Sequence, residues 1–286
     1  MVEDSGERRL PMSLKVSLTS FCAALYAIGA YATAYIPSPW GFGQFRPAVL
    51  IPAFFATVFG PWVGGVGAAI GTLICDSVKH GTLYMGSLLA AVPGNFAGFY
   101  VLGYMLRKRF TWGRFILASN LALAVGNAVV AFLYIFLYKV LFTQSLQMPF
   151  ESLVAVSIGL TAYWFVTMLP FVLTITPILV RAAAAAFPGI VPESIRAHSL
   201  REELPRTTFA LAFIAPGLAA LLTGVAIGFT PFGSYLASQY PKVFTPKVLE
   251  LLQLLFYLCG AALLILGFSF LGARSFLKPR SGQQSS

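Results

Sequence analysis

The stretch PAVLIPAFFATVFGPWVGGVGAAIGTLIC, residues 47–75, contains no Asp, Glu, Lys or Arg. About 20 apolar residues in a helix are enough to cross the ~30 Å hydrocarbon core of a bilayer. This stretch therefore allows two structures, either one long membrane helix or two shorter helices that break at Phe59-Gly60-Pro61-Trp62. The choice decides the side of the membrane on which every later connection lies.

Other long stretches of the chain also lack these four residue types, namely 16–45, 80–106, 115–138, 152–180, 207–241 and 251–273. Hydrophobic residues make up 58% of the protein and charged residues only 10%, which is far from the composition of a soluble domain. We predict an all-α polytopic membrane protein.

The distribution of Lys and Arg decides between the two structures, because cytoplasmic connections carry an excess of positive charge. With the break and a cytoplasmic N-terminus, 14 of the 19 basic residues lie inside; with one long helix, 7 lie inside and 12 outside. We therefore predict the break and place both termini in the cytoplasm. The expected spans are eight, at about 14–35, 47–60, 62–79, 83–106, 115–138, 150–180, 207–230 and 248–273.

Composition and motifs also exclude several classes of function. The net charge of +10 could indicate nucleic-acid binding. However, most of the basic residues lie beside the inner ends of the predicted helices, as membrane topology and anionic lipid headgroups require. Cys22, Cys75 and Cys259 lie in or beside apolar segments without a CxxC pair, and no Walker A or catalytic motif appears. We predict no nucleic-acid partner, no cofactor, no metal site and no enzymatic activity.

The predicted spans divide into a six-helix unit, 1–186, a cytoplasmic linker, 187–206, with Pro188, Pro192 and Pro205, and an added helical pair with a tail, 207–286. No repeat of fixed period is present, and the two halves of the chain do not match as they do in inverted-repeat transporters. This disfavours a self-contained alternating-access carrier.

The first predicted span carries small residues at a spacing of four, Ala23 with Ala27 and Ala30 with Ala34. A stripe of this kind lets two helix backbones approach closely in lipid. It indicates either packing within the protein or a docking face for another membrane subunit.

The loop that follows, residues 37–47, combines prolines, glycines, aromatic residues and one cation. Such a loop can fold over the mouth of a pocket as a lid. Alternatively, Trp40 lies in the interfacial aromatic belt and Arg46 extends to the lipid headgroups.

Four short motifs follow one another along the chain: Arg46-Pro47, Gly60-Pro61-Trp62-Val63-Gly64, a glycine-rich third helix that ends near Asp76, and Gly94-Asn95. In this order, on six predicted helices, the chain resembles the substrate-binding S components of energy-coupling factor (ECF) transporters over about residues 14–181. The resemblance implies a substrate-binding domain, 1–186, that captures a vitamin-like molecule from outside. It also implies a separate membrane coupling subunit and two ATPases as partners.

The resemblance assigns roles to particular residues as well. The stripe of Ala23, Ala27, Ala30 and Ala34 would dock on the coupling subunit. The loop after the first helix would cover the ligand, which gives Trp40, Gln44 and Arg46 a part in binding. The last two predicted spans exceed the usual six, and they fit either an altered coupling arrangement or an addition on the outer wall.

Polar side chains inside apolar helices are costly and mark candidate sites independently of any family. Asp76 could pair with Lys79, one helical turn further on, or it could bind a cationic ligand or anchor the loop. Asn95 is a second candidate. His80 has no partners for metal chemistry and is expected to be solvated.

The fifth and sixth predicted helices supply the remaining candidates. Asn127, Tyr134 and Tyr138 fall on about the same helical face and could line an outward-facing pocket with one amide and aromatic walls. The alternative for each is interhelical hydrogen bonding or packing in the aromatic belt. The sixth helix could complete the pocket with Glu151, Tyr163 and Trp164.

We predict that the protein is the substrate-specificity subunit of an ATP-driven micronutrient importer in the cell membrane. One alternative is a secondary carrier or channel that works without ATPases, and another is a membrane-embedded lipid-processing enzyme or scaffold. Aromatic walls favour a flat, largely uncharged ligand of the thiamine, flavin or purine type, whereas Arg46 or Lys139 could receive a carboxylate.

Overall fold

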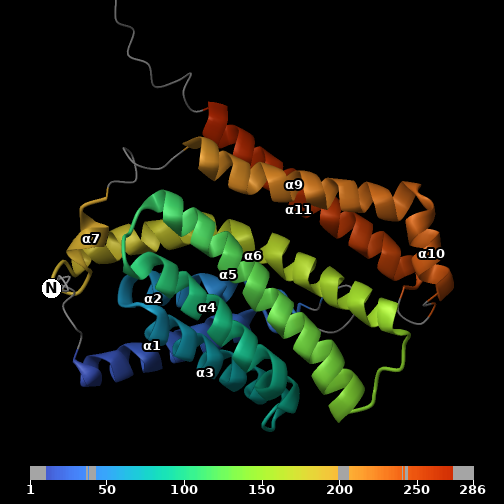
Figure 1. Ribbon diagram of the computed structural model, residues 1–286, viewed down its shortest axis with the longest axis horizontal. Helices are drawn as coiled ribbons and strands as arrows, with labels where there is room; N and C mark the ends of the chain where they lie inside the picture. Colours follow the sequence, from blue (N-terminus) through green and yellow to red (C-terminus); the bar gives the residue numbers. More distant parts are fainter. Residues whose placement is uncertain are drawn as a thin grey trace, which may run out of the picture. The chain divides into compact units, whose positions relative to one another are not determined.

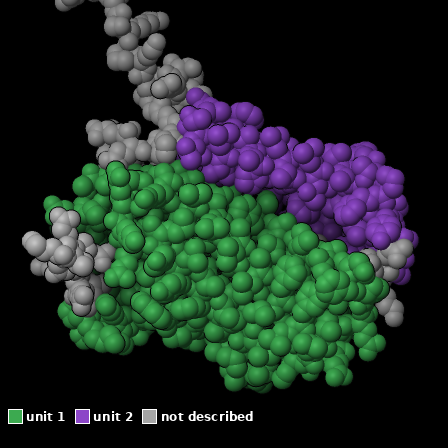
Figure 2. Space-filling view, in the orientation of Figure 1, with its two compact units in different colours: residues 1–203 green, residues 204–286 purple. Residues whose placement is uncertain are grey.

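The computed structural model describes residues 11–36, 38, 43–198, 206–239, 241 and 244–272, and the regular elements of these residues are all helical. The chain divides into two compact units, residues 1–203 and residues 204–286, which Figure 2 shows in different colours. The predicted functional division into a substrate-binding domain, a linker and a terminal pair stays a prediction.

The first unit is a bundle of packed helices (Figure 1). Its α-helices are α1 (Met12–Ala32), α2 (Leu50–Phe59), α3 (Pro61–His80), α4 (Val92–Arg107), α5 (Trp112–Phe132), α6 (Phe150–Ala186) and the short α7 (Glu193–Arg196). A 3₁₀ turn, η1 (Pro47–Val49), leads into α2. Two π-helical segments continue the α-helices, η2 (Ser87–Ala91) before α4 and η3 (Leu133–Phe142) after α5.

The break inside residues 47–75 is present in the structure. Gly60 lies between α2 and α3 with φ +93° and ψ 178°, a backbone conformation that residues with a Cβ rarely adopt. Pro61 is the first residue of α3, where its missing N–H leaves no helical hydrogen bond unmade. The predicted break is therefore confirmed, and the local sequence Gly60-Pro61 accounts for it.

Small residues bring α1 close to α3. A Cβ on Gly71 would lie 2.7 Å from the Ala23 carbonyl oxygen, so the two backbones nearly touch at this point. The four alanines of the predicted docking stripe are buried within the first unit, with exposed fractions of 4% for Ala23, 6% for Ala27 and 0% for Ala30 and Ala34. In this arrangement they pack inside the protein, and their contact with a coupling subunit stays a prediction.

Helix α6 is longer than a membrane crossing requires. Its 37 residues extend about 55 Å, nearly twice the ~30 Å hydrocarbon core. It continues past the predicted end at residue 180 to Ala186 and contains two internal prolines, Pro170 and Pro177.

The second unit consists of α9 (Arg206–Phe229), α10 (Pro231–Gln239) and α11 (Pro246–Gly272). Helices α9 and α11 lie side by side (Figure 1), and the rings of Phe209 and Phe270 meet edge to face at 4.5 Å between centroids. The two long helices correspond to the predicted spans 207–230 and 248–273. Helix α10 was not predicted, because it is short and carries no strong apolar pattern.

Within the described residues, seven helices are long and apolar enough to cross a membrane, and they comprise Met12–Ala32, Pro61–His80, Ser87–Arg107, Trp112–Phe142, Phe150–Ala186, Thr207–Phe229 and Pro246–Leu271. Pro47–Phe59 is a shorter apolar helix. Whether it is an eighth span, and whether both termini are cytoplasmic, stay predictions.

Candidate functional site

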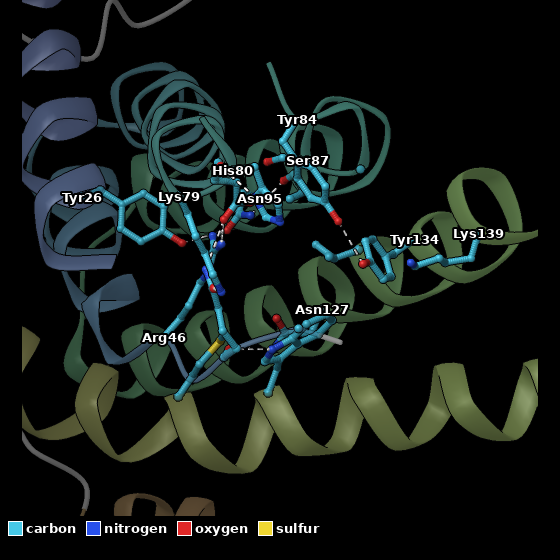
Figure 3. Close-up of a pocket in the computed structure, with 18 residues that line it drawn as sticks. Tyr26, Arg46, Lys79, His80, Tyr84, Ser87, Asn95, Asn127, Tyr134 and Lys139 are labelled. Carbon is cyan, nitrogen blue, oxygen red and sulfur yellow. Dashed lines mark hydrogen bonds and ion pairs between the residues drawn. The ribbon is translucent and has the colours of Figure 1, made fainter. Parts of the chain in front are cut away.

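A cavity of about 350 Å³ lies inside the first unit, among α1, α3, α4, α5, α6 and both π-helical segments (Figure 3). Its volume falls within the ~300–1,000 Å³ of typical small-molecule sites. The segment of residues 43–46, which precedes η1, forms part of its wall.

A buried ion pair forms one end of this cavity. The Arg46 guanidinium pairs with Asp76 Oδ1 and also donates to Thr72 Oγ1, so it joins the start of η1 to α3. Burial by itself lowers the pKa of Arg46, but the attraction of the Asp76 carboxylate together with the contributions of Tyr26 and Cys75 outweighs it, and the net effect raises this pKa. Arg46 is therefore a permanent cation whose charge Asp76 balances.

Asp76 does not pair with Lys79, contrary to one of the two sequence-based alternatives. Its Oδ1 accepts a second hydrogen bond, at 3.1 Å, from Gln44 Nε2. Lys79 instead donates to Gln44 Oε1 at 2.8 Å and to the carbonyl oxygen of Ala34. The network therefore ties the connection between α1 and η1 to the last turns of α3.

Helix α6 holds the same connection from the other side. Trp164 Nε1 donates to the carbonyl oxygen of Gln44 at 3.0 Å. Gly43 has φ +80°, and a Cβ there would lie 2.5 Å from Trp164 Cζ2. Only glycine can both adopt this conformation and lie against the indole.

Aromatic rings line the side of the cavity near the end of α3. The imidazole of His80 stacks on the ring of Tyr84 at 3.9 Å between centroids, with 2° between the planes. The Tyr84 hydroxyl lies 3.0 Å from the Tyr134 hydroxyl, and Tyr138 meets Tyr84 edge to face at 5.6 Å. His80 is exposed, as expected, but it also belongs to the cavity wall.

Two buried polar groups of the wall have no hydrogen-bond partner among the described residues, Asn127 Nδ2 and Ser87 Oγ. The exposed fraction is 7% for Asn127 and 1% for Ser87. A buried donor or acceptor without a partner costs about 1–3 kcal/mol. A ligand with complementary polar atoms would remove this cost at both groups.

Seven of the eleven residues proposed from sequence as ligand contacts line the cavity: Gln44, Arg46, Asp76, Asn95, Asn127, Tyr134 and Trp164. Tyr138 contacts Tyr84 but is not part of the wall, Tyr163 is buried elsewhere in α6, and Glu151 is exposed at the start of α6. Trp40 lies outside the described residues. For all eleven, a role in binding stays a prediction.

The sequence reasoning missed a group of wall residues around η2: Tyr84, Gly86, Ser87 and Ala91. It also missed Tyr26, Gly43, Val130 and Met168, and it gave Lys79 and His80 no binding role. One signal was available, because Ser87, Ala91 and Asn95 recur every four residues, as expected for one face of a helix.

A protein-family model described as the ECF-type riboflavin transporter, S component, matches residues 12–186. This match covers well over half of the chain. The chain belongs to this family. It is therefore a multi-pass membrane protein and the substrate-binding subunit of an ECF importer, not an enzyme.

Comparison with curated proteins and with solved structures gave no match. The family match ends at Ala186, the last residue of α6, so it contains the whole cavity wall. Helices α9, α10 and α11 lie beyond the matched part of this S component.

Proposed function

We propose that this S component captures riboflavin, or a closely similar flat heterocycle, in the cavity between α3, α4, α5 and α6. The single observation that supports this ligand class best is the pair of unpartnered polar groups, Asn127 Nδ2 and Ser87 Oγ, in a wall otherwise rich in aromatic rings. The ring system of riboflavin carries carbonyl oxygens and ring nitrogens at its edge. An amide N–H and a hydroxyl are suitable partners for such atoms.

The aromatic side chains suit the flat part of such a ligand. Trp164 of α6 and Tyr134 of η3 form part of the wall. Tyr84, which precedes η2 by three residues, is also part of it. Aromatic rings bind a flat heterocycle by offset stacking or by edge-to-face contact. Burial and the neighbouring Tyr134 raise the pKa of Tyr84, so its hydroxyl stays protonated and available for hydrogen bonding.

The ligand enters from the outer side in this proposal. Helices α4 and α5 join at the basic connection Arg107–Arg114, which the positive-inside bias assigns to the cytoplasm. Ser87 and Lys139 lie at the opposite ends of the same two helices. The cavity wall that they form is therefore on the outer side.

Release into the cytoplasm depends on partners in this proposal. A membrane coupling subunit and two ATPases would drive the step, in keeping with the family, and the alanine stripe of α1 would reach the coupling subunit only after a rearrangement that exposes it. The sequence of this chain has no Walker A motif for ATP hydrolysis of its own.

The test combines ligand identification with a binding titration. Protein purified in mild detergent is denatured, the released small molecules are identified by mass spectrometry, and riboflavin binding is measured by the quenching of flavin fluorescence. Wild-type protein should release about one flavin per chain. Asn127→Leu should weaken riboflavin binding at least tenfold, because a hydrogen bond in a buried site is lost.

Asn120→Leu is the matched control. Asn120 is on the same helix and its amide nitrogen bonds to the Ile116 carbonyl oxygen at 2.9 Å, away from the cavity. This variant should bind riboflavin as the wild type does. Protein that binds no flavin, or equal loss of binding in both variants, would contradict the proposal.

A further inference from the structure

The cavity wall carries more positive than negative charge. Its cations are Arg46, Lys79 and Lys139, and its one carboxylate is Asp76. Asp76 is already occupied, since it pairs with Arg46, which is the one ion pair found among the described residues. A wall with an excess of cations attracts anions and raises their local concentration.

The two lysines differ in how their charge is accommodated. Lys79 donates to two neutral oxygens, those of Gln44 and Ala34. The ammonium of Lys139 lies 5.7 Å from the ring centroid of Tyr134 and 5.6 Å from that of Tyr138, with no carboxylate within ion-pair distance in the part of the chain that the structure describes. Such cation–π contacts hold an ammonium in position without neutralising it.

The π-helical geometry of η3 places Lys139 at the cavity. Tyr134 and Lys139 both line the wall although they are five residues apart. In an α-helix, residues five apart point about 140° away from each other. In a π-helix the hydrogen bonds run from i to i+5, which brings these two residues nearly one turn apart on the same side.

Lys139 and Arg46 lie at opposite ends of the group of wall residues in Figure 3, with Asn127 between them. The end near Arg46 carries Arg46, Asp76 and Lys79, where Asp76 balances Arg46 and the Lys79 ammonium is already hydrogen-bonded to the Gln44 and Ala34 oxygens. At the other end, the Lys139 ammonium lies against the ring of Tyr134, and the unpartnered amide of Asn127 lies between the two ends (Figure 3). The wall therefore presents neutral donors for a ring and, in Lys139, a cation whose ammonium has only aromatic faces as partners among the described residues and is available for a separate group.

We propose that the ligand carries an anionic group, a carboxylate or a phosphate, which binds Lys139 while its flat, uncharged part lies against Asn127, Ser87 and the aromatic side chains. This inference rests on the proposed function and restricts its ligand class to flat heterocycles that carry an anionic group. Lys139 is a residue that selects for charge, and the anion replaces the aromatic faces as the main partner of its ammonium.

The experiment uses three probes that share one ring system: riboflavin, its 5′-phosphate and its 5′-carboxylic acid. Dissociation constants are measured by flavin fluorescence with the full-length protein in detergent. The wild type should bind one or both anionic probes at least about tenfold more tightly than riboflavin, as expected for a charge-assisted hydrogen bond. This preference should shrink as the salt concentration rises.

Variants assign the preference to Lys139. Lys139→Met should bind all three probes about equally. Lys139→Arg should retain the preference, which separates the loss of charge from a disturbance of folding. Lys108→Met, which removes an exposed cation of the connection between α4 and α5, should behave as the wild type.

The outcomes separate the inference from the proposed function. If riboflavin binds the wild type as tightly as both anionic probes, or if Lys139→Met keeps the preference, the inference is wrong and the proposed function stands. If none of the three probes binds, both are wrong. A preference for an anion that is lost in Lys139→Met and kept in Lys139→Arg supports both.

Discussion

Arg46 and Asp76 are thirty positions apart in the chain and form an ion pair in which their side chains are only 10% and 9% exposed. Arg46 precedes η1, and Asp76 lies in the last turns of α3. The pair therefore closes a loop that contains η1, α2 and most of α3. This relationship fixes one end of the cavity and holds Gln44 in position beside it.

The first prediction concerns the stability that this pair confers. Arg46→Met and Asp76→Leu should each lower the free energy of unfolding by about 3–5 kcal/mol, because each leaves a buried charge without its partner. The double variant should lose clearly less than the sum, because no unpaired charge remains. The free energy of unfolding of the wild type, both single variants and the double variant is measured by denaturant unfolding in mixed micelles, which completes a double-mutant cycle.

Arg109→Met is the control for this cycle, because Arg109 is exposed and its side chain has no carboxylate partner among the described residues. It should change the unfolding free energy by less than about 0.5 kcal/mol. Losses that simply add in the double variant would show that the two charges do not depend on each other.

The second prediction concerns Gly43 and separates the strain of a positive φ from the steric clash with Trp164. Gly43→Ala should abolish tight ligand binding, since a Cβ would both oppose φ +80° and lie 2.5 Å from the Trp164 ring. Gly81→Ala meets no atom within 4 Å but has φ +71°, so it should cost only the ~1–3 kcal/mol of a strained backbone. Gly189→Ala has neither problem and should be neutral.

Binding and thermal unfolding of the three glycine variants are measured side by side. If Gly43→Ala binds ligand as well as Gly81→Ala does, close contact between the segment of residues 43–46 and Trp164 is not required for the site.

The third prediction concerns the hydrogen bond between Trp164 and Gln44. Trp164→Phe keeps an aromatic ring and removes the Nε1 donor, which holds the Gln44 carbonyl at 3.0 Å. A hydrogen bond of this kind contributes about 1 kcal/mol, so ligand dissociation should become about fivefold faster. Stopped-flow flavin fluorescence measures the rate.

Trp62→Phe provides the comparison, because Trp62 is 59% exposed and is not part of the cavity wall. Its dissociation rate should equal that of the wild type. An unchanged rate in Trp164→Phe would mean that the segment of residues 43–46 is held without this bond.

The fourth prediction concerns the stability of the protein without ligand. Asn127→Leu removes a buried amide nitrogen that has no partner among the described residues, so the unliganded variant should unfold at a higher temperature than the wild type. Asn120→Leu removes an amide that is bonded to the Ile116 carbonyl, so it should not stabilise the protein. Thermal unfolding is measured for the wild type and both variants after bound flavin has been removed; a lower unfolding temperature for Asn127→Leu than for the wild type would contradict this account.

Part of the site could be predicted from the sequence because buried polar groups in membrane helices are costly and therefore few. This argument selected Asp76, Asn95, Asn120, Asn127 and Glu151. Asp76, Asn95 and Asn127 line the cavity, whereas Asn120 bonds to the Ile116 carbonyl oxygen outside it. Glu151 also lies outside the cavity wall, exposed at the start of α6, where a charged side chain costs little. Residues such as Ser87 and Tyr84 went unnoticed because small hydroxyls and aromatic rings are common in membrane helices.

The sequence by itself determined the helical membrane architecture and the break between α2 and α3. Both depend on local properties, namely the length of apolar stretches and the backbone conformations that Gly60 and Pro61 allow. The tertiary structure decided which residues meet. Asp76 pairs with Arg46 instead of its helical neighbour Lys79, because the connection after α1 lies against α3. Lys139 reaches the cavity because η3 is π-helical, a change of register that depends on packing and that an α-helical pattern does not indicate.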